Sequence, residues 1–470
     1  MPPAAARNTA LFIAILAGFL TPFDLSAVTI ALPSIGGEFP MDAIQLGWVS
    51  TAYLLASAVF LVPFGRLADI HGRKKILTAG LFVFSFASFL LIFSSSALSV
   101  ILLRILQGFG AAMIFGTAVA ILTSTTPPEQ RGRALGIYTT AVYLGLSLGP
   151  FFGGILTDRF GWRSIFFVNV PVGILAMATI FLFLKGEWAE CRGERFDLGG
   201  AIQYALTLMC VMYGFSLLPD RNGFILLIAG IVMLLVFIAR ELRIGYPLWN
   251  IRLFARNRVF LFSNLAALIN YGATFAVTFF LSLYLQYIYG YSAEHAGMIL
   301  VVQPVVMALV SSFAGRLSDR IAPGKIASAG MALSAVSLVL LTFTDTTTPL
   351  TAFIVILAIF GLGLGIFSSP NTNAIMGSVE RCYYGVASGT LSTMRLVGQM
   401  LSMGIALMVI AISIGDVQIT PPLYPAFIGS MKLSFLIFAG MCIAGIFFSL
   451  ARYHAAATFT GDSCPPEGSQ

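Results

Sequence analysis

Charged residues are scarce in this sequence. Asp, Glu, Lys and Arg make up only 10% of its 470 residues, whereas 58% of the residues are hydrophobic. A soluble protein is about one quarter charged, so this composition excludes an ordinary soluble domain. The lipid bilayer must be the main solvent of this chain.

Histidine and cysteine are also scarce, with three and five residues. The histidines His71, His295 and His454 lie between the hydrophobic runs or in the C-terminal tail. The runs therefore hold no catalytic Ser/His/Asp set and no metal triad, and we expect neither an enzyme nor a metal site. The cysteines are odd in number and lack paired spacing, which argues against a disulfide framework. A Gly-x-x-x-x-Gly-Lys loop for nucleotide phosphates is missing too, which disfavours an ATP-driven pump.

Hydrophobic runs fill most of the chain. A transmembrane helix needs about 20 mostly apolar residues, and fourteen segments reach that length. We expect spans near residues 10–33, 45–65, 76–95, 98–122, 134–156, 164–184, 197–217, 223–240, 259–285, 292–314, 325–344, 349–371, 385–412 and 431–451.

The basic residues test this count and give it a direction. They outnumber the acidic residues by 26 to 19, a balance that would also suit nucleic-acid binding. With a cytoplasmic N-terminus, however, 20 of them fall in inside segments, four in outside loops and two within spans. Because basic residues favour cytoplasmic loops, we expect a multi-pass protein of the plasma membrane with both termini in the cytoplasm. We expect no nucleic-acid partner.

A charged turn occurs twice. Gly65-Arg66-Leu67-Ala68-Asp69 begins the first copy and Gly315-Arg316-Leu317-Ser318-Asp319 the second, at an offset of 250 residues. A half of six helices needs only about 180–200 residues, so two further helices fit between the halves. We predict an all-α membrane protein with domains at 1–184 (six-helix bundle), 185–258 (two inserted helices with polar linkers) and 259–451 (six-helix bundle). Residues 452–470 are expected to form a disordered cytoplasmic tail.

Each turn is a candidate conformational latch, made of Gly65, Asp69, Gly72 and Arg73 in the first copy and Gly315 and Asp319 in the second. Glycine permits a tight bend, and a helix N-terminus or the following basic residues can neutralise the aspartate. Such a latch would hold the two halves together on the cytoplasmic side. Alternatively, the basic residues serve only as membrane anchors.

Three charges fall well inside predicted spans, away from the span ends, namely Asp24, Arg104 and Arg395. Because a charge inside the membrane is costly, each is a candidate functional residue. We predict that Asp24, near the middle of the first span, carries protons and that Arg104 takes part in proton coupling. Burial without a partner would favour the neutral acid, whereas pairing with Arg104 would favour the carboxylate. Purely structural roles remain the alternative for both.

The fifth span carries Gly145, Gly149 and Gly153 at four-residue steps, with Pro150 and Gly154 beside them. Small residues at this spacing let another helix pack closely, and proline removes a backbone hydrogen bond and bends the helix. We expect a helix that seals and pivots between the halves. Static packing is the alternative.

Aromatic and polar residues of several spans are candidates for a substrate cavity. We predict that amphipathic organic molecules contact some of them, since such cavities combine aromatic surface with a few polar groups. The candidates are Tyr53, Asn264, Tyr271, Phe275, Gln303, Asn371 and Arg395. For most of them, packing between helices is the simpler explanation.

The motifs together resemble one transporter family. The first charged turn resembles the signature loop of the major facilitator superfamily, Arg104 to Gly110 its intramembrane arginine motif, and Gly145 to Gly154 its antiporter motif. Asp24 to Pro33 and Ser388 to Arg395 resemble segments of its fourteen-helix drug:proton antiporter branch. The resemblance implies multidrug efflux by alternating access, driven by a proton gradient without a bound cofactor.

One departure concerns the substrate. Exporters of organic cations in this branch often carry extra acidic residues in the second half, and the spans here have none, so neutral, zwitterionic and anionic amphiphiles deserve equal weight. An exporter of a specific metabolite or lipid and a carrier-like sensor stay open as alternatives. We expect a monomer that interacts with protons, membrane lipids and a small amphipathic substrate.

Overall fold

The computed structural model describes residues 4–127, 130–249, 251–318, 320–380 and 384–455. These residues form helices and connecting turns, and no strand occurs among them. Within them, fourteen helical spans are long and apolar enough to cross a membrane. The predicted all-α fold and the number of spans are therefore confirmed.

The helices follow the predicted order and are mostly longer than the apolar runs. The first half contains α1 (Ala4–Glu38), α2 (Ala43–His71), α3 (Arg73–Ile92), α4 (Ala97–Thr125), α5 (Arg131–Phe160) and α6 (Arg163–Phe183). The inserted region contains α7 (Leu198–Leu217), α8 (Arg221–Glu241) and α9 (Ile251–Arg256). The second half contains α10 (Arg258–Leu283), a π-helical turn (Tyr284–Ile288), α11 (Ala293–Leu300), α12 (Val302–Ser318), α13 (Pro323–Leu341), α14 (Leu350–Gly377), α15 (Tyr384–Ser413) and α16 (Tyr424–Ala455).

Two details differ from the sequence prediction. The tenth span is divided at Val301 into α11 and α12. Pro304 follows closely and has no N–H to donate to the carbonyl of Leu300, which weakens the helix at this point. The second polar linker is also not a simple loop, because it contains the short helix α9.

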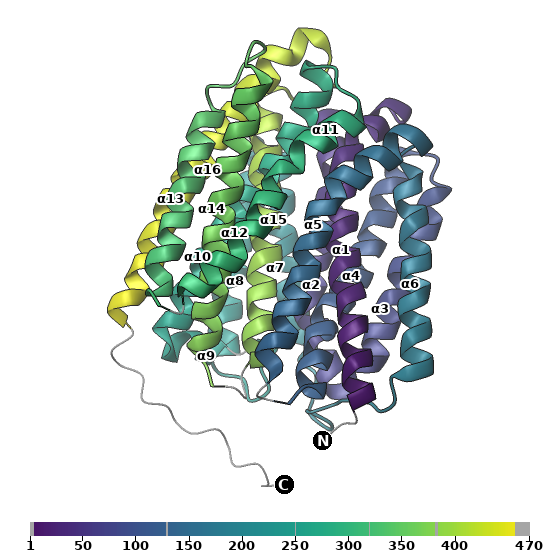
Figure 1. Cartoon of the computed structure of the whole chain (residues 1–470), viewed down its shortest axis with the longest axis vertical. Helices are drawn as coiled ribbons and strands as arrows, with labels where there is room; N and C mark the ends of the chain where they lie inside the picture. Colours follow the sequence, from purple (N-terminus) through teal and green to yellow (C-terminus); the bar gives the residue numbers. More distant parts are fainter. Residues whose placement is uncertain (1–3, 128–129, 250, 319, 381–383, 456–470) are drawn as a thin grey trace.

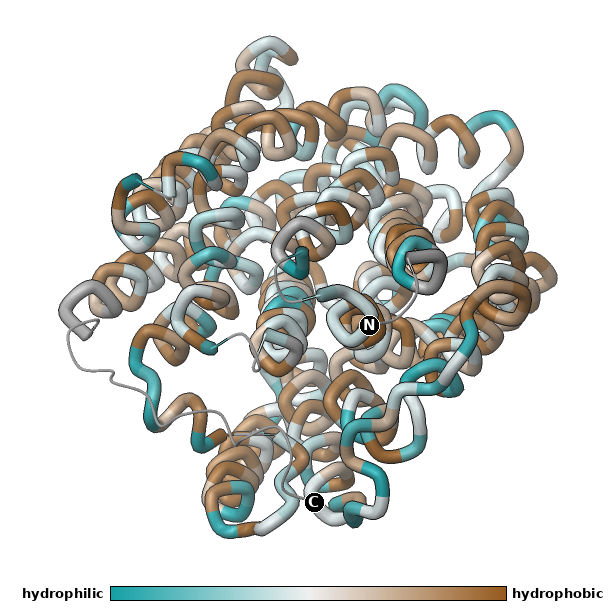
Figure 2. The backbone as a smooth tube through the Cα atoms, turned by 60° about the horizontal axis from the view of Figure 1, so that its bottom comes forward, coloured by the Kyte–Doolittle hydropathy of each residue, from teal (hydrophilic) through white to brown (hydrophobic). Residues whose placement is uncertain are grey.

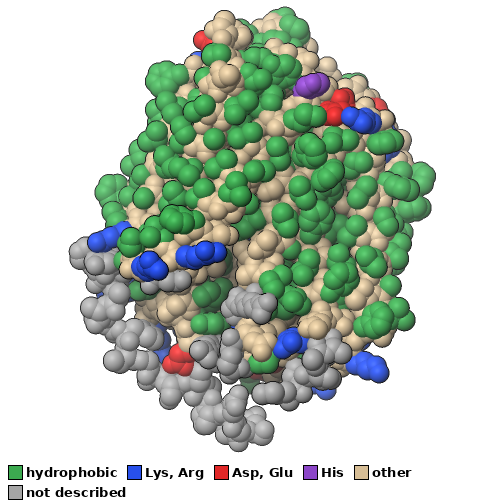
Figure 3. Space-filling model, in the orientation of Figure 1, with side chains coloured by type: hydrophobic (Ala, Val, Ile, Leu, Met, Phe, Trp, Pro, Cys, Tyr) green, Lys and Arg blue, Asp and Glu red, His purple; other side chains and the backbone are tan. Residues whose placement is uncertain are grey.

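The two halves stand side by side in Figure 1, the first half in purple to blue and the second in green to yellow. The start of α1 and the end of α16 lie at the same end of the bundle, which we call the terminal side. The other end, which carries α11 and the α1–α2 connection, is the opposite side. Seen toward the terminal side, the hydrophilic stretches lie mainly at helix ends and connections (Figure 2). Hydrophobic side chains cover most of the visible flank (Figure 3), as a lipid-facing surface requires.

The inserted helices do not share one environment. Many apolar side chains of α8 are exposed on the surface of the bundle. In contrast, α7 packs against α2 of the first half and α15 of the second. The Tyr204 hydroxyl of α7 donates to the Ala58 carbonyl of α2 at 3.2 Å. Of the two inserted helices, α8 therefore lies on the outside of the bundle, while α7 contacts both halves.

The two halves meet mainly on the opposite side. Ser282 of α10 donates to the Thr29 carbonyl at 3.0 Å, and Gln286 donates to the Ile30 carbonyl at 2.9 Å. Nearby, the backbone N–H of Ala43 donates to the carbonyl of Val417 at 3.0 Å. These contacts close the opposite side in this conformation.

Candidate functional site

Asp24 and Arg104 form an ion pair inside the first half. The Nη1 atom of Arg104 lies 2.5 Å from Oδ2 of Asp24, and both side chains are fully buried. Asp24 comes from α1 and Arg104 from α4, where it lies two turns from the opposite-side end. Of the two environments considered for Asp24, the structure therefore shows the paired one.

Amide side chains complete the shell around this carboxylate. Gln107 donates from Nε2 to Oδ1 of Asp24 at 3.0 Å, and Asn169 of α6 donates from Nδ2 to the same oxygen at 2.6 Å. Gln107 also donates to the Ser88 hydroxyl at 2.9 Å. Three side chains thus satisfy one buried carboxylate, as a buried charge requires.

Arg104 is held by further groups. Its Nε donates to the Val49 carbonyl at 3.1 Å, and its guanidinium lies 4.4 Å from the ring centre of Tyr53. Its Nη2 atom has no hydrogen-bond partner among the described residues. Removing one partner from a buried ion pair typically costs about 3–5 kcal/mol, because the other charge is then uncompensated. Separation of Asp24 from Arg104 would therefore need proton uptake or a new partner.

The sequence reasoning missed Asn169 and did not select Gln107. Gln107 lies one helical turn after Arg104, so a spacing of three residues could have indicated it. Asn169 is the single Asn, Gln or charged residue between Ser164 and Phe183 of the apolar sixth span, which was a weaker signal.

Three of the predicted cavity residues lie inside the bundles. Tyr53 is buried and belongs to the shell of Arg104. Asn264 is fully buried and donates to the Phe260 carbonyl of its own helix at 2.9 Å. Asn371 donates to the Ser263 carbonyl at 3.1 Å and so ties α14 to α10. Packing explains all three positions in this conformation.

The other four predicted cavity residues are Tyr271, Phe275, Gln303 and Arg395, and all are half-buried in the second half. The guanidinium of Arg395 lies 5.7 Å from the ring centre of Tyr271. Thr278 of α10 reaches Oε1 of Gln303 at 3.5 Å.

Facing this region from the first half are two tyrosines of α5 that the sequence reasoning missed. The Tyr143 hydroxyl contacts the Ser368 hydroxyl of α14, which joins the two halves. Tyr138 and Tyr143 both lie within electrostatic range of Arg395. Two tyrosines just before the glycine repeat were the available signal. The tertiary structure brings Tyr143 to Tyr271 and both tyrosines into the neighbourhood of Arg395.

The first charged turn has its partners within the first half and the following linker. Arg73 lies 2.7 Å from Oδ1 of Asp69 and 2.6 Å from Oε1 of Glu190, and it also contacts Ser124 of α4. Gly72 has φ +119°, and a Cβ atom there would collide with the Glu187 side chain, so glycine is required. Gly65 lies beside open space, where a Cβ atom would meet nothing within 4 Å.

The linker 185–197 is thus bound to this turn by hydrogen bonds and ion pairs. The backbone N–H of Cys191 donates to the Asp69 carbonyl at 3.0 Å, and Arg66 forms an ion pair with Glu194. Burial acts to raise the pKa of Glu190, but the hydrogen bonds and charge of Arg73 outweigh it and lower that pKa below 4.5. The expected latch between the two halves is not formed by these residues in this conformation, because their partners belong to α4 and the linker.

The second turn is less charged. Asn373 of α14 donates to the Ser318 hydroxyl at 2.6 Å and to the Gly315 carbonyl at 3.4 Å. Asp319 lies outside the described residues.

The glycines of α5 form two different contacts. A Cβ atom at Gly145, Gly149 or Gly153 would collide with α1, so these glycines set the close packing of α1 on α5 within the first half. Gly154, in contrast, faces Ala293 of α11, and the backbone of Pro150 meets Gly297 of the same helix. The predicted seal between halves therefore involves Pro150 and Gly154 rather than the whole glycine face.

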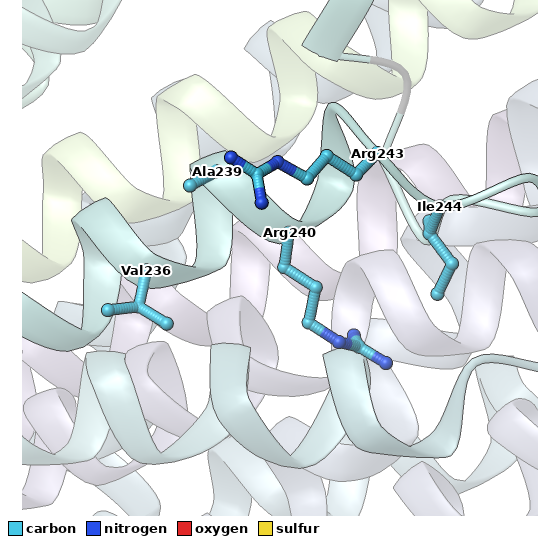
Figure 4. Close-up of a pocket in the computed structure, with 5 residues that line it drawn as sticks. All are labelled: Val236, Ala239, Arg240, Arg243 and Ile244. Atoms are coloured by element: carbon cyan, nitrogen blue, oxygen red, sulfur yellow. The ribbon is translucent and has the colours of Figure 1, made fainter.

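A surface pocket lies at the terminal-side end of α8, apart from these residues (Figure 4). Its lining residues are Val236, Ala239, Arg240, Arg243 and Ile244. Arg240 is neutralised by Asp197, with Nη1 2.6 Å from Oδ2. The pocket opens on the exposed outer helix and has no contact with the buried ion pair.

Known proteins of similar sequence are transporters. The chain is 33% identical to the riboflavin transporter RibZ of Clostridioides difficile over 388 residues, which cover 82% of this chain and 84% of that protein. It is 32% identical to the cephamycin export protein CmcT of Amycolatopsis lactamdurans over 415 residues, which cover 86% and 85% of the two chains.

The fold is also found in a solved structure. A bacterial homologue of the human lysosomal transporter Spinster, in an inward-facing and unoccupied conformation, superposes with a TM-score of 0.65 at 17% identity. The match covers 96% of this chain and 97% of the other. The family model of the Major Facilitator Superfamily matches residues 14–403 and again residues 264–463. This chain belongs to the Major Facilitator Superfamily.

Proposed function

We propose that this protein exports amphipathic organic compounds in exchange for protons, by alternating access between its two halves. The observation that carries the proposal is the fully buried Asp24–Arg104 pair, with its amide donors Gln107 and Asn169. A titratable ion pair in the membrane interior is typical of proton coupling in transporters. Among the similar proteins, the name of CmcT also supports export.

The contacts between the halves support the second part of the proposal. With cytoplasmic termini, the closed opposite side is the outer side of the plasma membrane, as expected of a carrier that does not face outward. A proton that reaches Asp24 from outside removes the negative charge and weakens its attraction to Arg104. The halves then repack, and proton release on the inner side restores the pair as substrate enters.

The test uses purified protein in proteoliposomes with an acidic lumen and a panel of amphipathic dyes. We expect dye to accumulate in the lumen as protons leave, and Asp24→Asn to abolish this gradient-driven uptake. Asp158→Asn is the matched control, because Asp158 is exposed and forms no ion pair among the described residues. Undiminished uptake by Asp24→Asn would refute the role of Asp24. Uptake driven only by an alkaline lumen would instead indicate symport.

A further inference from the structure

The two arginines within the spans have unequal surroundings. Arg104 is paired with Asp24, the only carboxylate deep within a span. Arg395 has no ion pair and no hydrogen bond among the described residues, and its only close partner is the ring of Tyr271. Since Asp24 is already engaged, the charge of Arg395 has no counterion among the residues that the structure describes. Its side chain is also only half-buried.

Tyr138 and Tyr143 of α5 interact electrostatically with this charge, Tyr271 of α10 lies next to it, and Ser368 of α14 contacts Tyr143. We call these four residues together with Arg395 of α15 the tyrosine–arginine cluster. Tyr143, Tyr271, Ser368 and Arg395 each lie about 14–20 Å along their helices from the terminal-side ends, at 1.5 Å per residue. They therefore share one level near the middle of the bundle. The cluster also contains residues of both halves, which is where alternating access places a substrate.

The chemistry of this cluster selects one class of ligand. A guanidinium binds carboxylate or sulfonate-type oxygens through parallel hydrogen bonds. Tyrosine rings offer flat apolar surface, and their hydroxyls offer hydrogen bonds. A cationic ligand would meet Arg395 without any carboxylate to offset the repulsion.

We propose that the substrate of this transporter is an aromatic organic anion, whose acidic group binds Arg395 and whose ring packs on the tyrosines of the cluster. This inference rests on the proposed transport function, but it concerns binding only. It commits to anions where the sequence left neutral, zwitterionic and anionic compounds open.

The experiment compares probes that share a ring system. We would measure equilibrium binding to the purified protein in nanodiscs, with empty nanodiscs subtracted. The probes are 8-anilino-1-naphthalenesulfonate, its neutral counterpart N-phenyl-1-naphthylamine, and the cation ethidium. We expect the sulfonate to bind at least tenfold more tightly than the other two. Arg395→Gln should lose that tenfold while leaving the neutral probe unchanged, and Arg395→Lys should retain part of it.

Arg243→Gln is the control, because it removes an exposed arginine far from the cluster. Thermal unfolding of each variant would check that the fold is intact. Unchanged sulfonate binding in Arg395→Gln, an equal loss for sulfonate and neutral probe, or a preference for ethidium would each overturn the proposal. If Arg395-dependent binding holds while no pH gradient drives transport, the proton-coupled function fails and the anion site stands.

Discussion

At the scale of single residues, the most informative position is one that sequence reasoning did not select. Asn169 donates a 2.6 Å hydrogen bond to the carboxylate of Asp24. Hydrogen bonds to charged groups contribute roughly 1.5–3 kcal/mol. Asn169→Ala should therefore lower the free energy of unfolding by about that amount and weaken transport driven by a pH gradient.

Thermal unfolding in detergent and proteoliposome uptake would measure both effects. Asn222→Ala is the matched control, because Asn222 is exposed on α8 and should be neutral. A wild-type melting temperature in Asn169→Ala would show that this hydrogen bond does not stabilise the fold.

At the scale of elements, the linker 185–197 is the part whose stability should depend on pH. The pKa of Glu190 is lowered from 4.5 because its hydrogen bonds to Arg73 outweigh the effect of burial. Since the folded pKa lies below the unfolded one, this contact stabilises the protein above about pH 4.5 and loses its effect as the pH falls through the folded value. The Glu190 side chain is 62% exposed, so the contribution should stay below about 1 kcal/mol.

Glu190→Gln should therefore melt slightly below the wild type at pH 7, and the difference should shrink as the pH falls below about 4.5. Asp158→Asn, which removes an exposed carboxylate that has no ion pair in the described part of the chain, should show no such change. Calorimetry between pH 7 and pH 3.5 measures the difference in melting temperature between each variant and the wild type. If the melting-temperature difference between Glu190→Gln and the wild type grew in acid, the stabilising role of the Glu190–Arg73 contact would be contradicted.

At the scale of the whole molecule, the closed opposite side depends on backbone contact between α5 and α11. A Cβ atom at Gly297 would lie 3.1 Å from the Pro150 carbonyl carbon and closer still to its oxygen. Overpacking costs about 1–3 kcal/mol, and an energy of this size changes an equilibrium roughly five- to 150-fold. Gly297→Ala should therefore shift the protein away from the conformation described above. The nearby Arg159–Glu294 ion pair involves an exposed arginine, so its removal should matter far less.

Spin labels at Asp158 and Thr346, both exposed on the opposite side, would report the separation of the halves. We expect a larger fraction of long distances in Gly297→Ala than in the wild type. Gly136→Ala is the control, since nothing lies within 4 Å of a Cβ atom at that position of α5. Identical distance distributions in the two variants would argue against the contact as a seal.

The sequence by itself determined the membrane fold, the fourteen spans and the duplicated halves, because these depend on composition, run length and a repeated turn. It also identified Asp24 and Arg104, since charges within apolar runs are conspicuous wherever the helices pack. Only the tertiary structure decided that these two meet, that Asn169 joins them, and that Glu190 rather than the second half binds Arg73. It also brought Tyr138 and Tyr143 within electrostatic range of Arg395. Such contacts join residues up to about 250 positions apart, and helix packing, which no local pattern records, brings them together.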